Sequence, residues 1–265
     1  MVVNKVFHDT SMIITKHLFI VTGGARGLGE QVVRSLIKHG AFVSIFDIND
    51  ELSHKLVNEL GQNECYFHGR TDVSKEADVE AALEKTIAHF PNTILRGAVL
   101  CSGIVSPPKA IQGYGPELSL TSFQQFEHVI KVNLLGTYCV AQKVANVLLK
   151  NEPIGQDGER GIIITVSSIL GLDGLIVGYG TSKAGISGLT LPLAKELAPF
   201  GIRVMSVAPG VFDTPIRNRS SNNTRLPLFP KRLGDPIEFA DLVLQIIQMP
   251  MLNGSTIRLD GALRA

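Results

Sequence analysis

The sequence predicts a single α/β domain in which a doubly wound, seven-stranded parallel sheet is flanked by helices on both faces. Short apolar runs rich in β-branched residues alternate with longer amphipathic stretches, which is typical of parallel strands joined by crossover helices. With 265 residues the chain is long enough for one large core, and no linker-like stretch divides it. We therefore expect residues 1–265 to fold as one unit.

Strands and helices are expected to alternate along the whole chain. Helical periodicity and strand-length apolar runs distinguish the two kinds of segment. The expected strands span residues 18–22, 42–47, 64–68, 97–101, 161–167, 203–208 and 256–259. The expected helices span residues 28–39, 51–60, 76–89, 123–149, 179–197 and 237–248.

Two connections interrupt this alternation. Residues 104–120 are rich in glycine and proline, and residues 211–235 contain several prolines. Both follow the carboxyl ends of expected strands, where open α/β sheets bind ligands, and long loops there are often functional. We expect residues 211–235 to form a substrate lid, although the polar tip at 220–224 is also compatible with a disordered surface loop.

Charge and cysteine content narrow the possible partners. With 25 basic and 24 acidic residues, the chain carries a net charge of +1 and gives no electrostatic reason to expect nucleic acid or an anionic membrane. The three cysteines lack metal-site spacing and suit a reducing compartment, so no metal is expected. No apolar run has the length of a membrane span, and the first sixteen residues resemble neither a secretory signal nor a transit peptide. We expect a small-molecule ligand and an intracellular location, cytoplasmic or mitochondrial.

A glycine-rich turn over residues 22–29 directly follows the first expected strand and opens the first expected helix. Gly23, Gly27 and Gly29 permit a tight turn and a close approach of the backbone, while the helix N-terminus offers N–H groups to a pyrophosphate. Their spacing differs from the common G-x-G-x-x-G pattern, and a glycine turn without a ligand is the alternative. The strand before it and the helix after it favour a dinucleotide site.

Two carboxylates are expected at the adenosine half of such a dinucleotide. Asp47 ends the second expected strand, where a carboxylate accepts ribose hydroxyls and repels a 2′-phosphate, so NAD is favoured over NADP. Arg26 argues the other way, because a guanidinium in the turn could bind a 2′-phosphate, but it does not remove the repulsion from Asp47. Asp72, followed by Val73, is expected beside the adenine and could also cap the next helix.

Tyr179 and Lys183 are four residues apart in a segment with helical periodicity, so their side chains are expected on one face of a helix. A positive charge beside a phenol favours the phenolate and lowers the pKa of the tyrosine, which then becomes a usable acid and base. An ordinary amphipathic helix that exposes a tyrosine and a lysine is the alternative.

With these motifs in this order, the chain resembles the short-chain dehydrogenase/reductase family over essentially its whole length. The resemblance rests on residues 22–29, Asp72-Val73, Asn133 within residues 132–136, Ser167-Ser168, Tyr179 with Lys183, and Pro209-Gly210 followed by Thr214-Pro215. Residues 151–153, 158–163, 232–236, 252–254 and 258–262 most resemble the branch of 3-hydroxyacyl-CoA dehydrogenase type 2, or 17β-hydroxysteroid dehydrogenase type 10. The resemblance implies a Rossmann-like fold and a homotetramer with contacts through residues 123–149, residues 179–197 and the C-terminal segment.

The resemblance also implies residue roles. Tyr179 would be the acid/base, Lys183 would bind the nicotinamide ribose and lower the tyrosine pKa, Ser168 would bind the substrate oxygen, and Asn133 would hold a water that links Lys183 to solvent. The cofactor is expected to contact Gly23, Arg26, Gly27, Leu28, Gly29, Asp47, Asp72, Val73, Cys101, Gly103, Tyr179, Lys183, Phe212 and Thr214. In this set, Cys101 contributes backbone rather than a reactive thiol, and Phe212 and Thr214 cover the nicotinamide carboxamide.

One departure from the family pattern lies between Ser168 and Tyr179, where the chain is two residues shorter than usual. The loop over residues 169–178 must therefore take a tighter path. Ser167 would reduce the difference to one residue, but Ser168 keeps the usual distance to Gly171 and Gly174. Alternate strand residues face opposite sides, so only one serine can serve the site, and we expect it to be Ser168.

The expected function is NAD-dependent interconversion of a secondary alcohol and a ketone, with a 3-hydroxyacyl thioester, a steroid or a similar apolar alcohol as substrate. Apolar loop residues suit such a substrate but could equally pack onto the core, namely Ile104, Val105, Leu172, Leu175, Ile176, Phe212, Leu226, Leu228 and Phe229. One alternative is an NADPH-dependent ketone or 3-oxoacyl reductase, which Asp47 disfavours. Another is a cofactor-bound scaffold or RNA-processing subunit, for which the near-neutral charge gives no support.

Overall fold

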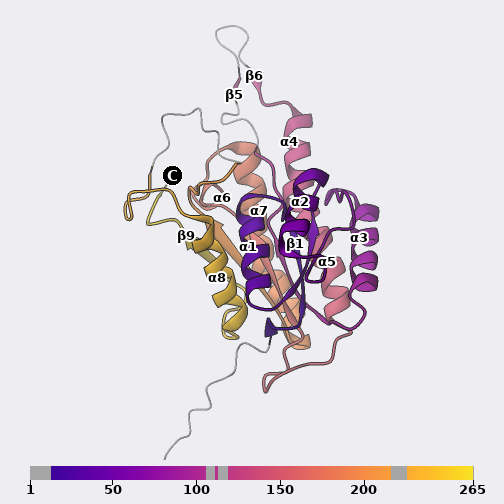
Figure 1. The fold of residues 1–265 in the computed structure, drawn as a ribbon. Helices are drawn as coiled ribbons and strands as arrows, with labels where there is room; N and C mark the ends of the chain where they lie inside the picture. The colour runs from indigo at the N-terminus through magenta and orange to yellow at the C-terminus, as the bar shows by residue number, and fades with distance from the viewer. Residues whose placement is uncertain (1–12, 106–110, 113–118, 216–225, 265) are drawn as a thin grey trace, which may run out of the picture.

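The computed structural model describes residues 13–105, 111–112, 119–215 and 226–264. A central sheet has the strand order β3-β2-β1-β4-β7-β8-β9, and every pairing in it is parallel (Figure 1). Its strands are β1 (Leu18–Thr22), β2 (Phe42–Phe46), β3 (Cys65–Tyr66), β4 (Leu95–Leu100), β7 (Gly161–Val166), β8 (Ile202–Pro209) and β9 (Thr256–Leu259). The predicted seven-stranded, doubly wound parallel sheet is confirmed.

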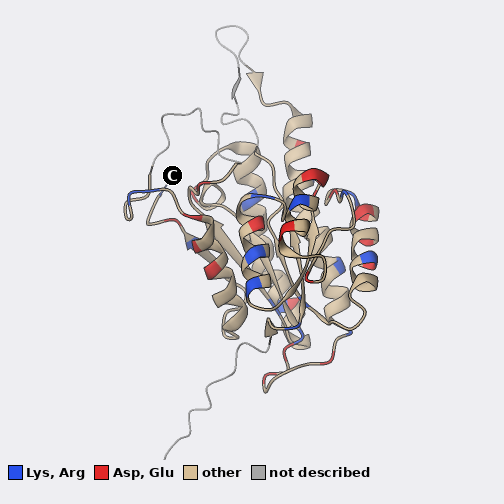
Figure 2. Cartoon of the chain, viewed as in Figure 1, with Lys and Arg blue, Asp and Glu red and all other residues tan. Residues whose placement is uncertain are grey.

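Helices cover both faces of this sheet. Residues of α1, α2 and α8 pack in one hydrophobic core, and residues of α3, α5 and α7 pack in a second core on the opposite face. The helices are α1 (Gly27–Lys38), α2 (Asp50–Leu60), α3 (Glu76–His89), α4 (Phe123–Ile130), α5 (Gly136–Leu148), α6 (Ile169–Leu172), α7 (Val177–Leu197) and α8 (Pro236–Gln248). Both basic and acidic residues occur along α1, α2 and α3 (Figure 2).

The two cores follow from the alternation of side chains along each strand. In β1, Phe19 and Val21 belong to the core with α1 and α8, whereas Leu18 and Ile20 belong to the core with α3 and α5. Each fully buried side chain of this size contributes roughly 1.5–3 kcal/mol of transfer free energy. The side chains of these strands are buried on both faces of the sheet. Apolar residues are therefore favoured at successive positions, which explains the near-continuous apolar runs.

The order of the strands creates a crevice at one edge of the sheet. From β1 the chain proceeds outward through β2 to β3, then returns to β4 on the other side of β1 and continues outward to β9. The strand order therefore reverses between β1 and β4, and the carboxyl ends of parallel strands at such a reversal diverge around a ligand site. The glycine-rich turn follows β1 and the Cys101 segment follows β4, so both lie at this crevice.

Several elements differ in detail from the sequence-based expectations. The expected helix over residues 123–149 consists of α4, a π-helical segment η3 (Lys131–Leu135) and α5. The expected strand over residues 64–68 is shorter in the structure, where β3 forms the part that pairs with β2. The loop over residues 104–120 contains an antiparallel pair, β5 (Ile111–Gln112) and β6 (Ser119–Leu120), while residues 106–110 and 113–118 lie outside the described part. Among the described residues, no helix combines the length and apolar character needed to cross a membrane.

Candidate active site

The turn between β1 and α1 has the conformation that the glycine pattern predicts. Gly23 and Gly27 both have φ of +62°, a region that favours glycine. A Cβ on Gly23 would lie 2.9 Å from the backbone nitrogen of Ser102, so a side chain there would block the approach of the segment that follows β4. The side chain of the N-cap residue Arg26 makes no capping hydrogen bond, so it leaves the first N–H groups of α1 available to a ligand.

A cavity of about 310 Å³ lies at this crevice. Eleven of the expected cofactor contacts line it: Gly23, Arg26, Gly27, Leu28, Gly29, Asp47, Asp72, Val73, Cys101, Gly103 and Thr214. Further lining residues are Ile48, Arg70, Thr71, Ser102, Ile104, His128, Val132 and Pro215. The cavity thus extends from the N-terminus of α1 to the loops after β2, β3, β4 and β8.

Asp47 supports the glycine-rich turn as well as lining the cavity. Its Oδ2 accepts a hydrogen bond of 3.0 Å from the backbone N–H of Ala25, and its Oδ1 accepts one of 3.0 Å from Asn49. A carboxylate has about four acceptor positions, so both oxygens keep capacity for ribose hydroxyls. Asp47 therefore links the glycine-rich turn to the wall of the cavity.

Asp72 lines the cavity and also stabilises the turn before α3. Its Oδ1 accepts hydrogen bonds from the backbone N–H and the hydroxyl of Ser74, at 3.1 and 2.7 Å, and so holds the turn before α3. Burial acts to raise the pKa of Asp72, but the Ser74 hydrogen bonds together with the charges of Lys75 and Arg70 outweigh it and leave the pKa below its usual value. Val73, which follows, packs against Gly136 at the start of α5, where a Cβ would lie 2.9 Å from its Cγ2.

Tyr179 and Lys183 lie one turn apart on α7. The Lys183 Nζ is 5.7 Å from the centroid of the Tyr179 ring and donates a hydrogen bond of 2.7 Å to the carbonyl of Val166, at the end of β7. Lys183 is only 3% exposed, and burial lowers the pKa of its ammonium to about 8. The two side chains therefore point to the same region, above the carboxyl end of β7.

The pKa of Tyr179 differs from the sequence-based expectation. We expected Lys183 to lower it, whereas in the structure burial is the largest influence and raises the pKa of the phenol. A hydrogen bond with the hydroxyl of Ser168 acts in the opposite direction and partly offsets burial. The ammonium of Lys183 is directed to the Val166 carbonyl, so its effect on the phenol is weaker than the spacing suggested.

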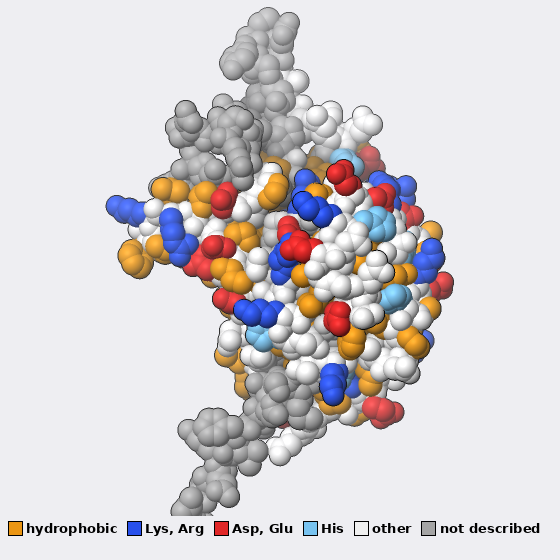
Figure 3. Space-filling model, in the orientation of Figure 1, with side chains coloured by type: hydrophobic (Ala, Val, Ile, Leu, Met, Phe, Trp, Pro, Cys, Tyr) orange, Lys and Arg blue, Asp and Glu red, His pale blue; other side chains and the backbone are white. Residues whose placement is uncertain are grey.

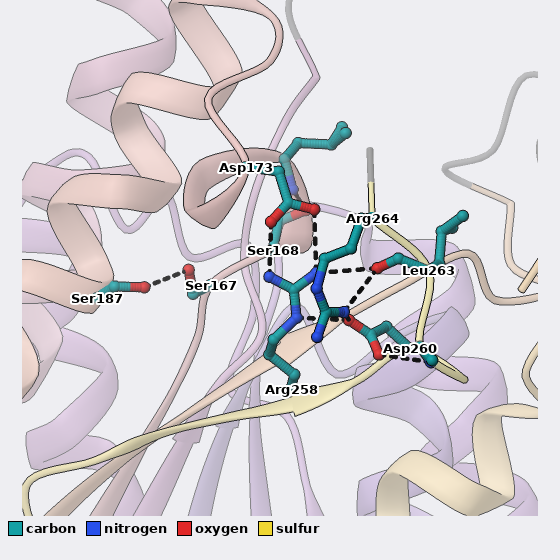
Figure 4. A network of polar contacts seen from close by, with 10 residues as sticks. Ser167, Ser168, Asp173, Ser187, Arg258, Asp260, Leu263 and Arg264 are labelled. Carbon is teal, nitrogen blue, oxygen red and sulfur yellow. Dashed lines mark hydrogen bonds and ion pairs between the residues drawn. The ribbon is translucent and has the colours of Figure 1, made fainter. Parts of the chain in front are cut away.

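The structure places the two neighbouring serines on opposite sides. Ser168 reaches Tyr179, and its hydroxyl also accepts from the backbone N–H of Leu170 at 3.2 Å. Ser167 instead donates to the backbone carbonyl of Lys183 at 2.8 Å and contacts the Ser187 hydroxyl at 2.7 Å (Figure 4). Ser167 therefore attaches β7 to α7, while Ser168 is the serine beside the phenol.

Asn133 is completely buried within the π-helical segment η3. Its Oδ1 accepts from the backbone N–H of Ile104 at 2.8 Å, and its Nδ2 donates to the Ile104 carbonyl at 2.9 Å and to the Ser182 hydroxyl at 3.0 Å. Ser182 in turn donates to the backbone carbonyl of Tyr179 at 2.7 Å. The amide therefore connects the loop after β4 to the helix that carries Tyr179, and π-helical segments often occur at such functional positions.

Lys183 and Asn133 both approach the backbone closely at Gly103. A Cβ built on Gly103 would lie 3.3 Å from the Lys183 Nζ and 3.4 Å from the Asn133 Oδ1. The ammonium and the amide oxygen therefore both border the backbone that lines the cavity. The thiol of Cys101 lies in the same region, and burial raises its pKa to about 12, which keeps it protonated at neutral pH.

The ring of Phe212 packs in the core. Its ring packs edge-on against Phe239 at 6.5 Å between centroids, and a Cβ on Gly234 would lie 2.6 Å from the ring. Phe212 is 7% exposed and belongs to the core, so its side chain is not part of the cavity wall. The position is apolar and follows Pro209-Gly210, and these features do not distinguish a core contact from a cofactor contact.

Sequence reasoning also missed functional candidates. Ser182 holds Asn133, and its position three residues after Tyr179 on the same helix face could have indicated it. Arg70 and His128 line the cavity, but neither belongs to a motif or a periodic pattern. On the face shown in Figure 3, the described basic, acidic and apolar side chains are interspersed, without an extended area of one charge.

A comparison with protein families decides the classification. The model of the short chain dehydrogenase family matches residues 17–225. The chain belongs to the short-chain dehydrogenase family. As a short-chain dehydrogenase, the protein is an oxidoreductase that uses a nicotinamide cofactor, and it interconverts a secondary alcohol and a ketone. The predicted family is confirmed.

Individual relatives of this short-chain dehydrogenase cover nearly its whole length. It is 41% identical to 3-hydroxyacyl-CoA dehydrogenase type-2 of Rattus norvegicus, over 92% of this chain and 94% of the relative. It is 40% identical to ipsdienol dehydrogenase of Ips pini, over 95% of this chain and 98% of the relative. The crystal structure of 3-hydroxyacyl-CoA dehydrogenase type-2 from Mycobacterium avium matches with a TM-score of 0.85 and 38% identity, over 94% of this chain and 96% of that structure.

Proposed function

We propose that the protein is an NAD-dependent dehydrogenase with Ser168, Tyr179, Lys183 and Asn133 as its reactive site. The observation that carries this proposal is the position of Tyr179, which hydrogen-bonds Ser168 on one side and has Lys183 5.7 Å from its ring on the other. All three groups lie above the carboxyl end of β7, next to the strands that border the cavity.

The cavity fits a dinucleotide. Its walls combine the N-terminus of α1 with glycines that allow the backbone to turn tightly, and this combination suits a pyrophosphate. A bound nicotinamide dinucleotide supplies the hydride acceptor for an alcohol or the hydride donor for a ketone. The cofactor contacts assigned from the sequence stay part of the proposal, with Phe212 contributing backbone rather than its ring.

The residues of the chain would manage the proton. In alcohol oxidation, the Tyr179 Oη takes the hydroxyl proton, and in ketone reduction it returns a proton to the carbonyl oxygen. Ser168 donates a hydrogen bond to the substrate oxygen and stabilises the negative charge that develops there. Lys183 holds a ribose hydroxyl, and Asn133 fixes the loop after β4 and orients a water that connects Lys183 to solvent.

NAD is the proposed dinucleotide because Asp47 lies at the adenosine end of the cavity. Its carboxylate can accept ribose hydroxyls and would repel a 2′-phosphate. Arg26 and Arg70 also line the cavity, but both are exposed, and solvent screens their attraction for a phosphate. An NADPH-dependent reductase is the alternative that a comparison of NAD(H) with NADP(H) would detect.

The proposed substrate is an apolar secondary alcohol, such as a 3-hydroxyacyl thioester or a hydroxysteroid. Relatives over most of the chain bear the names 3-hydroxyacyl-CoA dehydrogenase and ipsdienol dehydrogenase. Most of the apolar loop residues remain accessible rather than packing onto the core: Val105, Leu172, Leu175, Leu226, Leu228 and Phe229 are 39–82% exposed. We assign the described parts of residues 211–235 to a lid over the substrate, while residues 216–225 lie outside the described part.

We further propose that the chain is one domain that assembles as a homotetramer in a reducing intracellular compartment, cytoplasmic or mitochondrial. The large apolar side chains Phe123, Leu135, Tyr138 and Leu191 on α4, η3, α5 and α7 are 44–78% exposed and would form contacts between copies. The free cysteines Cys65, Cys101 and Cys139 suit a reducing compartment. Fractionation of cells that express the tagged protein tests the location.

A panel of 3-hydroxyacyl-CoA thioesters, hydroxysteroids and short alcohols with NAD or NADP tests the proposed reaction, with NADH followed by its absorbance. We expect oxidation to increase with pH, because the reactive form of Tyr179 is the phenolate and burial raises its pKa. Tyr179→Phe should lower kcat by about 10²–10⁴-fold. Turnover that survives this substitution would refute the mechanism.

A further inference from the structure

An arginine on the last strand contacts the loop that separates Ser168 from Tyr179. The Nη1 of Arg258, on β9, lies 2.6 Å from the Oδ1 of Asp173, and its Nη2 lies 3.0 Å from the Oδ2 (Figure 4). Asp173 directly follows α6, in the segment that is shorter than the family pattern. The two residues are 85 positions apart in the sequence and meet only through the fold.

The guanidinium of Arg258 is fixed on its other side as well. Its Nε donates to the Oδ2 of Asp260 at 2.6 Å, and its Nη2 also donates to the carbonyl of Leu263 at 2.9 Å. The side chains of Asp260, Asp173 and Arg258 are 7%, 12% and 23% exposed. The pair of Arg258 and Asp173 is bidentate and partly buried, and Asp260 binds the same guanidinium from another side. Because the planar guanidinium is held by both carboxylates, the arrangement is far more rigid than an exposed ion pair.

Asp173 is connected to Ser168 by a single hydrogen-bonded turn. The backbone N–H of Asp173 donates to the carbonyl of Ile169 at 2.8 Å, and the Ser168 hydroxyl accepts from Leu170 at 3.2 Å. Gly171, between them, packs so closely against α7 that a Cβ would lie 2.7 Å from the backbone carbon of Lys183. A movement of Asp173 would therefore displace the turn that carries Ser168 and lies against the helix of Tyr179 and Lys183.

We propose that Arg258 is a positioning residue for the reaction, acting through Asp173 to hold Ser168 beside Tyr179. The inference rests on the proposed function, since it assigns Ser168 and Tyr179 to the substrate oxygen. Arg258 touches neither the substrate site residues nor the lining of the cavity, so it acts through the loop. In this chain the shortened loop obtains its rigidity from the neighbouring strand β9.

The test compares Arg258→Gln and Asp173→Asn with the double variant and with a matched control. Arg34→Gln is the control, because Arg34 also forms a bidentate pair, with Glu59 at 2.6 and 2.9 Å, and is similarly exposed, at 29%. Each single variant is expected to lower kcat at least ~10-fold, with the dissociation constant for NADH changed less than about twofold. The double variant should lose no more than either single variant, because both changes break the same contact.

A graded series separates positioning from simple loss of stability. Arg258→Lys keeps the charge but cannot bind both oxygens of Asp173, so its kcat should lie between those of the wild type and Arg258→Gln. Unfolding midpoints are recorded for every variant, and kcat is measured well below them. Asp173→Asn leaves the Arg258–Asp260 pair in place. This variant therefore still tests the positioning role if Arg258→Gln does not fold.

The results separate this inference from the proposed function. If the wild type shows no turnover, or turnover survives Tyr179→Phe, the proposed function fails. If the wild type is active and sensitive to Tyr179→Phe, but the Arg258 and Asp173 variants match Arg34→Gln in kcat, the positioning role is wrong. Additive losses in the double variant, or losses confined to NADH binding, would also overturn it.

Discussion

Lys183 shows how a single residue of the site opposes stability. The proposed role of Lys183 needs an ammonium, but the side chain is buried, and burial disfavours its charged form. The pKa of Lys183 falls from 10.5 in the unfolded chain to about 8 in the folded one. Between these values the unfolded chain binds more protons, so the free energy of unfolding rises with pH there, and the full cost of Lys183 is present below about pH 8.

Lys183→Met should therefore stabilise the protein at neutral pH while abolishing turnover. We expect the free energy of unfolding to increase by about 1–3 kcal/mol near pH 7, less the lost hydrogen bond to Val166. The gain should shrink as the pH approaches 10.5, where the wild-type lysine becomes neutral in both states. Urea denaturation followed by circular dichroism at several pH values measures it, and a gain independent of pH would contradict the burial of a charged lysine.

Asp47→Asn should relax the proposed preference for NAD. The substitution removes the negative charge at the adenosine end of the cavity and keeps an amide oxygen that can accept from Ala25 or Asn49. We expect the ratio of kcat/KM for NADP to that for NAD to rise by about tenfold or more, which corresponds to about 1.4 kcal/mol of removed repulsion. Steady-state kinetics with both dinucleotides give this ratio, and an unchanged ratio would show that Asp47 does not determine the preference.

At the scale of single elements, α7 carries the most information. Its sequence combines the proposed reactive residues with several glycines, and these glycines have different surroundings in the structure. A Cβ on Gly180 would collide with the carbonyl of Leu175, whereas nothing lies within 4 Å of a Cβ on Gly188. Close packing therefore requires glycine beside Tyr179, while two turns later glycine only weakens the helix.

Two alanine substitutions on this helix should have opposite effects. Gly188→Ala should raise the free energy of unfolding by about 0.5–1 kcal/mol, because alanine has the higher helix propensity and the site has room. Gly180→Ala should destabilise the protein by about 1–3 kcal/mol and lower kcat, because the loop before Tyr179 must move. Chemical denaturation of both variants makes the comparison, and equal changes would indicate that helix propensity alone matters.

The sequence could predict the strands and helices better than the irregular segments within them. The apolar runs and helical periodicity placed the seven strands and the main helices, since these patterns reflect burial on the two faces of one sheet. The π-helical segment around Asn133 was missed, because one extra residue in a helical turn leaves little trace in the periodicity. The core packing of the Phe212 ring was also not predicted, because an apolar residue beside the site can equally well face the core.

At the scale of the whole molecule, the arrangement of exposed apolar residues is expected to determine assembly. Tyr138 on α5 and Ile87 on α3 are almost equally exposed, at 44% and 43%, but only Tyr138 lies on a helix where we propose contacts between copies. The sequence alone could not separate such a face from core, because both are apolar with the same period. This is the reason why the homotetramer followed from resemblance rather than from periodicity.

Tyr138→Asp should therefore shift the assembly to smaller species, while Ile87→Asp should not. A buried unpaired carboxylate in an interface costs several kcal/mol, whereas the same residue on a solvent-facing helix costs little. Light scattering coupled to size-exclusion chromatography gives the mass of each species. Identical masses for the two variants would contradict the proposed contact face.

The central place of β1 has a consequence for the order in which the protein opens. All five residues of β1 are buried, and β1 pairs with β2 on one side and with β4 on the other, whereas β9 pairs with β8 at the edge of the described sheet and is half-buried throughout. Amide protons in β1 should exchange with deuterium only when the entire molecule unfolds, while those of β9 should exchange through smaller openings. Mass spectrometry of peptic fragments would then report the same unfolding free energy from β1 that denaturants give, and a lower one from the strand that carries Arg258.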